Sequence, residues 1–290
     1  MSDSGRPPSI TRDLLALAKP RITLMAVLMA WIGIWFAGGT DAITTLSTLF
    51  GTALVVASAN ALNMIIEREG DKRMERTANR PLPSGRMSTA TAVVFASVTG
   101  AVSAYLLWFL VNPLAFTVGF GALVGYAAIY TPLKRRSSLA LPIGAIPGAA
   151  PPLLGWAAAA RSLDAPGLVL FAIMFLWQLP HFLAISVYLK KDYSGAGIVV
   201  VPLESSDSNA QKMALTYALA LAPVSAALYY LGVAGWLYLS VAILTSAAFC
   251  AVLFKGIGEG SDEWARPAFL ASLLYLPALM LGLFIDGVLL

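Results

Sequence analysis

Stretches of apolar residues long enough to cross a lipid bilayer fill most of this chain. A membrane-spanning helix needs about 20 consecutive apolar residues. We mark segments of this kind near residues 20–38, 46–66, 89–111, 114–131, 139–160, 167–188, 211–231, 235–254 and 267–288. Inside a bilayer, unpaired backbone N–H and C=O groups are costly, and continuous apolar runs of this length satisfy them as helices. The sequence therefore predicts an all-α, polytopic membrane protein with about nine transmembrane helices.

The composition supports this class and excludes others. Only 12% of the 290 residues are charged, whereas soluble domains carry about a quarter. The net charge of +4 does not indicate a nucleic-acid partner, because no nucleic-acid-binding fold is this apolar. The single cysteine, Cys250, lies in an apolar run, so we expect no internal disulfide. We expect one domain over residues 1–290, with 1–14 as a flexible N-terminal tail and no cleaved signal peptide.

The basic residues are distributed unequally between the two sides of the predicted spans. Every Lys and Arg except Arg161 falls on one side, which also contains all the acidic residues except Asp41, Asp164 and Asp286. By the positive-inside rule, the basic side of an inner-membrane protein faces the cytoplasm. The sequence thus predicts a cytoplasmic N-terminus and a C-terminus on the outer side. We expect the three isolated aspartates to be solvated.

Three oxygen-bearing side chains follow one another at the end of the second predicted span. Asn63, Glu67 and Asp71 are spaced four residues apart, so a continuing helix would place them along one stripe. Such side chains suit Mg²⁺, which typically takes one or two carboxylates together with substrate phosphates. The same pattern is also compatible with a solvated loop whose charges satisfy one another.

The loop after this stripe is basic and shaped by proline and glycine. It reads Arg-Thr-Ala-Asn-Arg-Pro-Leu-Pro-Ser-Gly-Arg over residues 76–86, a composition that forbids a continuous helix. Arginines in it could hold diphosphate oxygens. The acidic stripe followed by this loop resembles the first signature of the UbiA prenyltransferase superfamily. That resemblance implies helices around a central cavity, with Mg²⁺ and a diphosphate at its cytoplasmic mouth.

Later elements resemble the branch of this superfamily that prenylates haem. They are Lys-Pro-Arg-Ile-Thr at 19–23, Trp-Gln-Leu-Pro-His-Phe at 177–182, and Lys-Lys-Asp-Tyr at 190–193 with Ala-Gly-Ile at 196–198. Two features depart from the family pattern. Glu67 and Glu69 stand where aspartates are more frequent, and the second acidic motif retains only Asp192 as a clear carboxylate. Because an acidic and basic loop follows both the second and the sixth span, the two loops could cover one mouth as a pseudo-repeat.

The resemblance implies a Mg²⁺-dependent prenyltransferase with two substrates. It would transfer a farnesyl group from farnesyl diphosphate to a vinyl group of haem b, with addition of water, giving haem O and diphosphate. The expected metal ligands are Asn63, Glu67, Asp71 and Asp192. The expected diphosphate clamp comprises Arg21, Arg68, Arg76, Arg80, Lys134, Arg135, Lys190 and Lys191. A haem A synthase or an oxidase assembly protein would receive the product.

Aromatic residues and the only histidine are further candidates. Tyr126 and Tyr130 could shield an allylic cation by cation–π contact. His181 could ligate haem iron and Trp177 could line the porphyrin. Both residues are also compatible with ordinary helix packing, in which a lone histidine is hydrogen-bonded to a neighbour.

Two other functions remain compatible with parts of the pattern. One is a UbiA-type prenyltransferase whose acceptor is an aromatic quinone precursor. The other is a secondary transporter of an anionic metabolite, although transporters place their charged sites near the membrane midplane. In this chain the acids and bases gather at one end of the predicted spans, which favours the enzyme.

Overall fold

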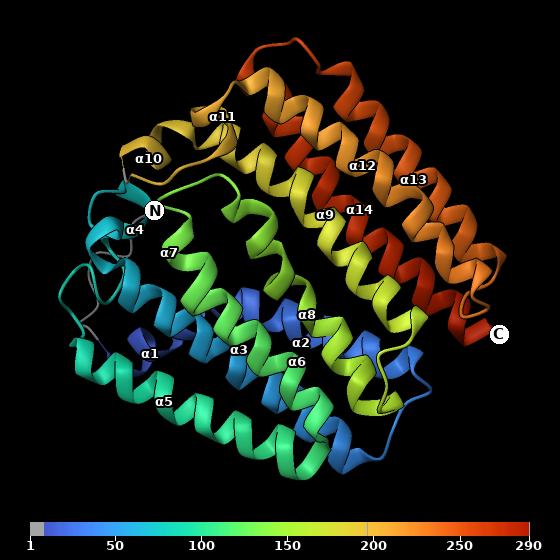
Figure 1. Ribbon diagram of the computed structural model, residues 1–290, viewed down its shortest axis with the longest axis horizontal. Helices are drawn as coiled ribbons and strands as arrows, with labels where there is room; N and C mark the ends of the chain where they lie inside the picture. Colours follow the sequence, from blue (N-terminus) through green and yellow to red (C-terminus); the bar gives the residue numbers. More distant parts are fainter. Residues whose placement is uncertain (1–8, 196, 290) are drawn as a thin grey trace.

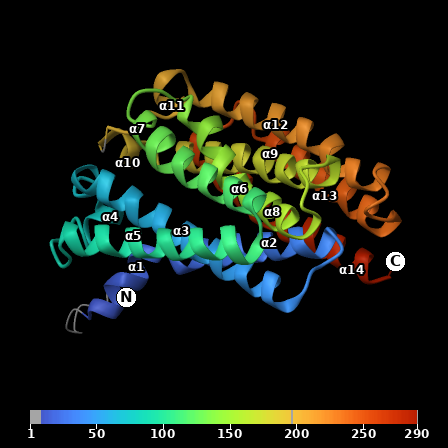
Figure 2. The same cartoon turned by 60° about the horizontal axis from the view of Figure 1, so that its bottom comes forward.

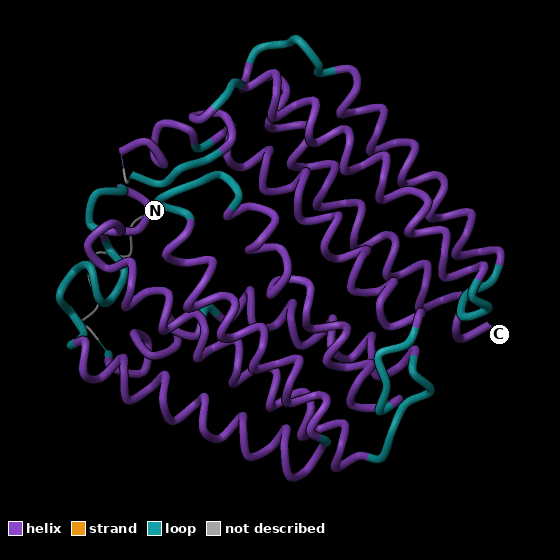
Figure 3. The backbone as a smooth tube through the Cα atoms, viewed as in Figure 1, coloured by secondary structure: helices purple, strands orange, loops and turns teal. Residues whose placement is uncertain are grey.

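The computed structural model describes residues 9–195 and 197–289, and this part of the chain consists of helices and connecting loops (Figure 3). The long helices are α2 (Pro20–Phe36), α3 (Ala42–Asp71), α5 (Thr89–Tyr105), α6 (Pro113–Val124), α8 (Ala140–Ala160), α9 (Ala165–Tyr188), α12 (Asp207–Tyr230), α13 (Trp236–Lys255) and α14 (Ser261–Leu289). The short ones are α1 (Ile10–Ala18), α4 (Glu75–Ala78), α7 (Thr131–Leu133), α10 (Lys190–Gly195) and α11 (Val201–Glu204). Two π-helical segments, η1 (Leu106–Val111) and η2 (Gly125–Tyr130), continue α5 and α6.

The predicted membrane fold is confirmed. Within the described residues, 8 helical runs are long and apolar enough to span a membrane, and α1 with α2, bent by 47°, would make a ninth. These runs coincide with the nine predicted segments to within a few residues. The largest difference is α3, which continues to Asp71 instead of ending near residue 66. The acidic stripe is therefore helical throughout.

The expected N-terminal tail is shorter than residues 1–14. Residues 10–14 belong to helix α1, and residues 1–8 lie outside the described part of the chain. Tertiary contacts stabilise this helix. Leu17 is fully buried in a cluster with Ala61 and Met64 of α3, and the Asp13 carboxylate pairs with Arg86 at 3.2 Å. Residues 10–14 are therefore helical, and the pair that anchors Asp13 joins residues far apart in the sequence.

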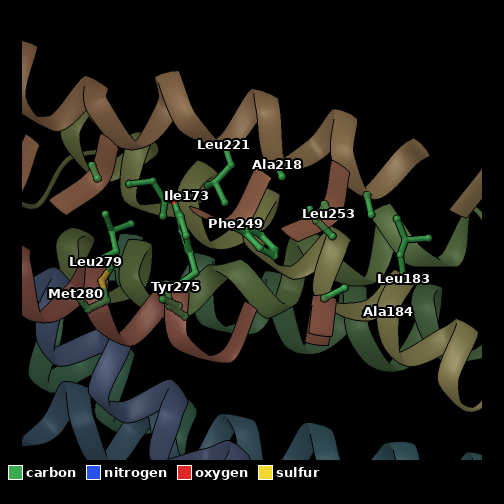
Figure 4. Packing of buried hydrophobic residues seen from close by; sticks show 14 of the residues in the cluster. Ile173, Leu183, Ala184, Ala218, Leu221, Phe249, Leu253, Tyr275, Leu279 and Met280 are labelled. Atoms are coloured by element: carbon green, nitrogen blue, oxygen red, sulfur yellow. The ribbon is translucent and has the colours of Figure 1, made fainter. Parts of the chain in front are cut away.

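The helices form two groups that meet along α8 and α9. Figures 1 and 2 show α3, α5 and α6 on one side and α9, α12, α13 and α14 on the other. The larger hydrophobic cluster lies in the second group, where side chains of four helices converge (Figure 4). Among them, Ile173, Leu221 and Leu279 are almost completely inaccessible. In this arrangement, the segments that connect the helices of both groups lie at the same two ends of the bundle.

One end of the bundle contains most of the short helices. The segments α4, α7, α10 and α11 lie along the same edge, next to the last turns of α3 and α9 (Figure 1). We call this the basic end, since residues 68–86, 134–136 and 190–212 contribute its Lys and Arg side chains. The arrangement brings the two loops of the predicted pseudo-repeat to one end of the molecule.

At the opposite end, Asp286 differs from the expectation. It is 4% exposed instead of solvated. Its carboxylate accepts hydrogen bonds from the backbone N–H groups of Gly235 and Tyr238, so it caps the N-terminus of α13 from another helix. Asp41 and Asp164 are exposed as predicted. The sequence could not separate these cases, because the cap depends on a contact between distant residues.

Helices α2 and α8 approach each other through small residues. A Cβ atom at Gly155 would collide with the Ala30 carbonyl oxygen, and one at Gly33 would collide with the Pro152 carbonyl oxygen. Such close backbone approach is a usual basis of helix association in membranes. It also holds α8 firmly against α2, despite the prolines inside α8.

We expect Gly155→Ala to lower stability by about 1–3 kcal/mol, because the added methyl group forces α2 and α8 apart. The matched control is Gly121→Ala in α6, where a Cβ atom meets nothing within 4 Å. That control should leave the midpoint of thermal unfolding in detergent unchanged or slightly raised. Equal unfolding midpoints for the two variants would contradict the close-packing interpretation.

Candidate active site

The stripe of Asn63, Glu67 and Asp71 is buried in the last three turns of α3. These side chains belong to residues that are only 2%, 6% and 1% exposed, respectively. A solvated loop is therefore not what the chain forms here. Carboxylates removed from water need a partner, because an unpaired buried charge costs several kcal/mol.

Each buried carboxylate has its own cation. Arg80 donates to Asp71 at 2.7 Å between Nη1 and Oδ2, and Lys134 pairs with Glu67. The two cations come from different segments, the loop after α4 and the residue after α7. The Thr77 hydroxyl also donates to the Asp71 carbonyl oxygen at 2.8 Å, which holds this loop on the end of α3. The pairs thus fix three segments of the basic end around one pair of acids.

Asn63, one turn deeper, lies in a short chain of hydrogen bonds. Its amide nitrogen donates to the Thr131 hydroxyl at 3.3 Å, and that hydroxyl donates to the Tyr126 carbonyl oxygen at 2.7 Å. Its amide oxygen accepts from Lys19 at 3.5 Å. Burial, together with the nearby Arg80 guanidinium, lowers the pKa of Lys19 to about 8. The side chain of Lys19 therefore brings a third cation to the stripe.

Lys19 and Thr131 were not among the predicted site residues. Lys19 connects α1 to α2 with φ of 47°, a left-handed conformation that is uncommon for residues other than glycine. A signal was present, since Pro20 at the first helical position marks a helix start and puts Lys19 at its N-cap. Thr131 gave no comparable signal, because its partner is 68 residues away in the sequence.

The two predicted tyrosines lie on the π-helical segment η2. The ring centroids of Tyr126 and Tyr130 are 5.2 Å apart, and Lys134 Nζ lies 5.5 Å from the Tyr130 centroid. A Cβ atom at Gly144 would collide with the Tyr130 ring, so α8 packs closely against it. Single turns of π-helix often occur at functional sites. Here the turn places both rings beside the cations of the stripe.

Several predicted clamp residues are not in contact with the stripe. Arg68 pairs with Glu69 at 3.3 Å and donates to the Thr89 hydroxyl at 2.8 Å, on the side of α5. Lys190 pairs with Asp207 at 2.8 Å. Lys190, Lys191 and Asp192 line a separate cavity of about 660 Å³ with Glu263. Arg21, Arg76 and Arg135 are exposed at the basic end.

The loop after α9 nevertheless reaches the site. Its Val199 N–H donates to the Lys134 carbonyl oxygen at 2.8 Å, next to the side chain that neutralises Glu67. Tyr193 lies within electrostatic reach of Arg76, and burial raises the pKa of its hydroxyl. From the sequence, Tyr193 was part of a motif but not a predicted site residue, whereas its neighbour Asp192 was predicted as a metal ligand. The two loops of the pseudo-repeat therefore lie at the same end, close enough for Arg76 to influence Tyr193.

The donor set of the stripe fits Mg²⁺ completed by phosphate oxygens. Carboxylate and amide oxygens are the hard ligands that this ion prefers. Asn63 and Asp71 are separated by roughly 12 Å along α3, whereas two oxygens on one Mg²⁺ are at most about 4 Å apart. Adjacent members of the stripe can share an ion, but all three cannot. In the described part of the chain, no group of three His, Cys, Asp or Glu residues could hold a metal alone.

The predicted haem residues lie in the other half of the molecule. His181 Nδ1 is 2.8 Å from the Ser272 hydroxyl oxygen of α14. Trp177 Nε1 donates to the Ser272 carbonyl oxygen at 2.8 Å. His181 precedes the end of α9 by seven residues, which places it roughly 10 Å inside the bundle from the basic end. It makes no direct contact with the acidic stripe.

A sequence profile decides the family. The sequence profile of the UbiA prenyltransferase family matches residues 24–274, which is most of the chain. The chain belongs to the UbiA prenyltransferase family. The resemblance noted in the sequence is therefore confirmed, and the chain is a prenyltransferase instead of a transporter.

Within the UbiA family, similar curated proteins share one name. The "Protoheme IX farnesyltransferase" of Anaeromyxobacter sp. (strain Fw109-5) is 44% identical over 289 residues, covering 99% of this chain and 98% of that protein. The protein of the same name from Myxococcus xanthus (strain DK1622) is 42% identical, covering 97% and 96%. The one from Sorangium cellulosum (strain So ce56) is 49% identical, covering 82% and 86%.

Solved structures of UbiA-type proteins have the same fold. A digeranylgeranylglyceryl phosphate synthase superposes with a TM-score of 0.82 at 17% identity, covering 97% of this chain and 99% of that one. A UbiA homologue from Archaeoglobus fulgidus, bound to DMAPP and Mg²⁺, superposes with a TM-score of 0.67 at 15% identity, covering 96% and 100%. At these identities the likeness establishes the fold alone.

We expect Lys134→Gln to weaken binding of inorganic pyrophosphate in the presence of Mg²⁺ by about tenfold to a hundredfold. It removes one buried cation, and hydrogen bonds to charged groups contribute about 1.5–3 kcal/mol. Lys212→Gln, on the exposed face of α12, is the matched control and should bind normally. Isothermal titration calorimetry measures both, and equal affinities would exclude Lys134 from the anion site.

Proposed function

We propose that this chain transfers a farnesyl group from farnesyl diphosphate to a vinyl group of haem b, giving haem O and diphosphate. The observation that carries the proposal is a pair of buried, cation-neutralised carboxylates in a chain similar over almost its whole length to proteins named protoheme IX farnesyltransferase. The balanced reaction consumes one water, which supplies the hydroxyl group of the product side chain.

The residues of α3 would hold Mg²⁺ together with the diphosphate. Asn63 with Glu67, or Glu67 with Asp71, would provide the protein oxygens of one ion, because adjacent members of the stripe can share it. When bound, the metal neutralises negative charge that develops on the departing diphosphate. Asp192, which lines the neighbouring cavity, is proposed as a further ligand from the second loop. Lys190 and Lys191 would assist from the same loop.

The ion pairs of the site would exchange partners when substrate enters. Arg80 and Lys134 now neutralise Asp71 and Glu67. With the carboxylates engaged by a metal ion, Arg80 and Lys134 would be available to diphosphate oxygens, with Lys19 beside them. Exposed Arg21, Arg76 and Arg135 would capture the anion first, and Arg68 would act only from the rim. The site is thus preorganised for an anion at no cost in buried unpaired charge.

The chemistry proceeds by breaking the allylic C–O bond of the donor. The electron pair leaves with the diphosphate, and the allylic cation is attacked by the vinyl carbon of the haem. Water then adds to the resulting cation and releases one proton. Tyr126 and Tyr130 would stabilise the first cation with their ring faces and keep water away from it.

The orientation follows from the distribution of charge. The basic end would face the cytoplasm across the cell's inner membrane, with the N-terminus inside and the C-terminus on the outer side. Farnesyl diphosphate would enter there from the cytoplasm, while haem b and the product remain in the bilayer. A haem A synthase or an oxidase assembly protein would then receive haem O.

Mass analysis of extracted haem tests the proposed reaction. Membranes that contain the wild-type chain should yield a haem heavier by one farnesyl group and one hydroxyl group, because a vinyl group becomes a hydroxyethylfarnesyl group. Asp71→Ala should reduce that product about a hundredfold or more, because it removes charge stabilisation at the diphosphate. Asp41→Ala, at the opposite end of the bundle, is the control and should be fully active.

Unmodified haem b with a correctly inserted wild-type chain would overturn the haem acceptor. In that case, aromatic quinone precursors are the next acceptors to assay, with the same Asp71→Ala variant.

We expect Tyr126→Leu to lower kcat by about 30-fold and to leave the affinity for farnesyl diphosphate nearly unchanged. A desolvated cation–π contact contributes about 2 kcal/mol, and the cation exists only during the reaction. Tyr126→Phe keeps the ring and should retain most of the activity. Equal losses in turnover and affinity would contradict the shielding role.

A further inference from the structure

His181 is held in a single orientation by two helices. Its ring stacks on Trp177 at 5.0 Å and on Phe269 at 5.2 Å, with interplanar angles of 18° and 28°. These contacts fix the plane of the ring. The bond between Nδ1 and the Ser272 hydroxyl fixes its rotation within that plane. A second bond, from Trp177 to the Ser272 backbone, ties the same stretch of α9 to the same residue.

The hydrogen bonds of Ser272 decide which ring nitrogen carries the proton. A serine hydroxyl has one hydrogen to donate, and that of Ser272 goes to the Phe269 carbonyl oxygen at 2.6 Å. In that arrangement the hydroxyl oxygen accepts from His181, and we assign the proton of the neutral imidazole to Nδ1 and its lone pair to Nε2. Ser272 is fully buried, so no water competes for this bond.

Nε2 is left without a partner within the protein. Among the residues that the structure describes, the only hydrogen bond to the ring is the one at Nδ1. The His181 side chain is half-buried, so the ring is not sealed off from a ligand. Metal-binding histidines show the same arrangement, in which one nitrogen donates to a neighbour and the other faces the metal.

We propose that His181 Nε2 is an axial ligand of the haem iron, and that Ser272 is the positioning residue that fixes its tautomer. The inference rests on the proposed function, because it assumes haem b as the acceptor. Iron at His181 would lie roughly 10 Å from the basic end of α9, and Glu67 lies about 6 Å from that of α3. The porphyrin would thus bind deeper than the diphosphate, with the farnesyl chain between them.

The chain contains one histidine, which makes the tautomer directly measurable. We would label the full-length protein with ¹⁵N-histidine, use a purification tag without histidine, and record the nitrogen spectrum in detergent. The wild type should show the Nδ1–H tautomer. Ser272→Ala should give a mixture with the Nε2–H form, and Ser272→Thr should restore the wild-type pattern. The matched control is Ser246→Ala, a buried serine of α13 that bonds to Tyr275 and leaves His181 untouched.

Haem titration then tests the ligation itself. The wild type with haem b should give the absorption and electron paramagnetic resonance spectra of histidine-bound iron. His181→Ala should lose that signature and regain it when free imidazole is added. Ser272→Ala should weaken haem binding about tenfold, as found for residues that support metal ligands. Ser246→Ala should behave like the wild type.

The outcomes separate three claims: the iron ligation by His181, the role of Ser272 and the proposed function. Identical spectra for wild type and His181→Ala, with haem O still formed, would overturn the ligation and leave the proposed function standing. An Nε2–H tautomer in the wild type would overturn the role of Ser272. Failure of the wild type to bind haem b or to form haem O would overturn the proposed function and the iron ligation together.

Discussion

The basic end of this protein depends on the need to neutralise two carboxylates in a place where water does not reach them. Glu67 and Asp71 lie on α3, but their cations come from the residue after α7 and from the loop after α4. Satisfying both acids therefore fixes the relative positions of three segments. The same requirement explains why Lys19 and Thr131 converge on Asn63, one turn deeper. The groups that define the site are also those that close the end of the bundle, so its stability and its chemistry share one set of contacts.

The second half of the molecule follows a different principle. Its core is apolar, and one set of buried polar groups there is closed. Tyr275 shares hydrogen bonds with Ser225 and Ser246, while the Tyr238 hydroxyl donates to the Ser225 carbonyl oxygen. These groups satisfy one another, as a buried network must. The Ser272 and His181 set differs, because Nε2 of the ring has no hydrogen bond to any described residue. This open nitrogen is the group that we propose as the iron ligand.

The spans and the acidic stripe could be predicted because they depend on local pattern. Hydropathy gives the nine segments, and a four-residue spacing gives the stripe on α3. The assignment of cations could not be predicted in the same way. Arg68 is adjacent to Glu67 but turns to Thr89, whereas Lys134, which pairs with Glu67, lies two spans later. Lys190 likewise pairs with Asp207, and Asp286 caps a distant helix. Charge type is visible in a sequence, but the choice of partner depends on tertiary structure.

The pairing of Glu67 with Lys134 has a consequence for biogenesis. A chain is synthesised from its N-terminus, so α3 enters the membrane before α7 exists. Asp71 gains Arg80 within a few residues, but Glu67 has no partner until the span that ends at Leu133 has emerged. Until then, the last turns of α3 stay near water at the membrane surface, because an unpaired carboxylate resists burial. Docking of α7 would thus complete the burial of the last turns of α3, so the Glu67–Lys134 pair would link that burial to the order of synthesis.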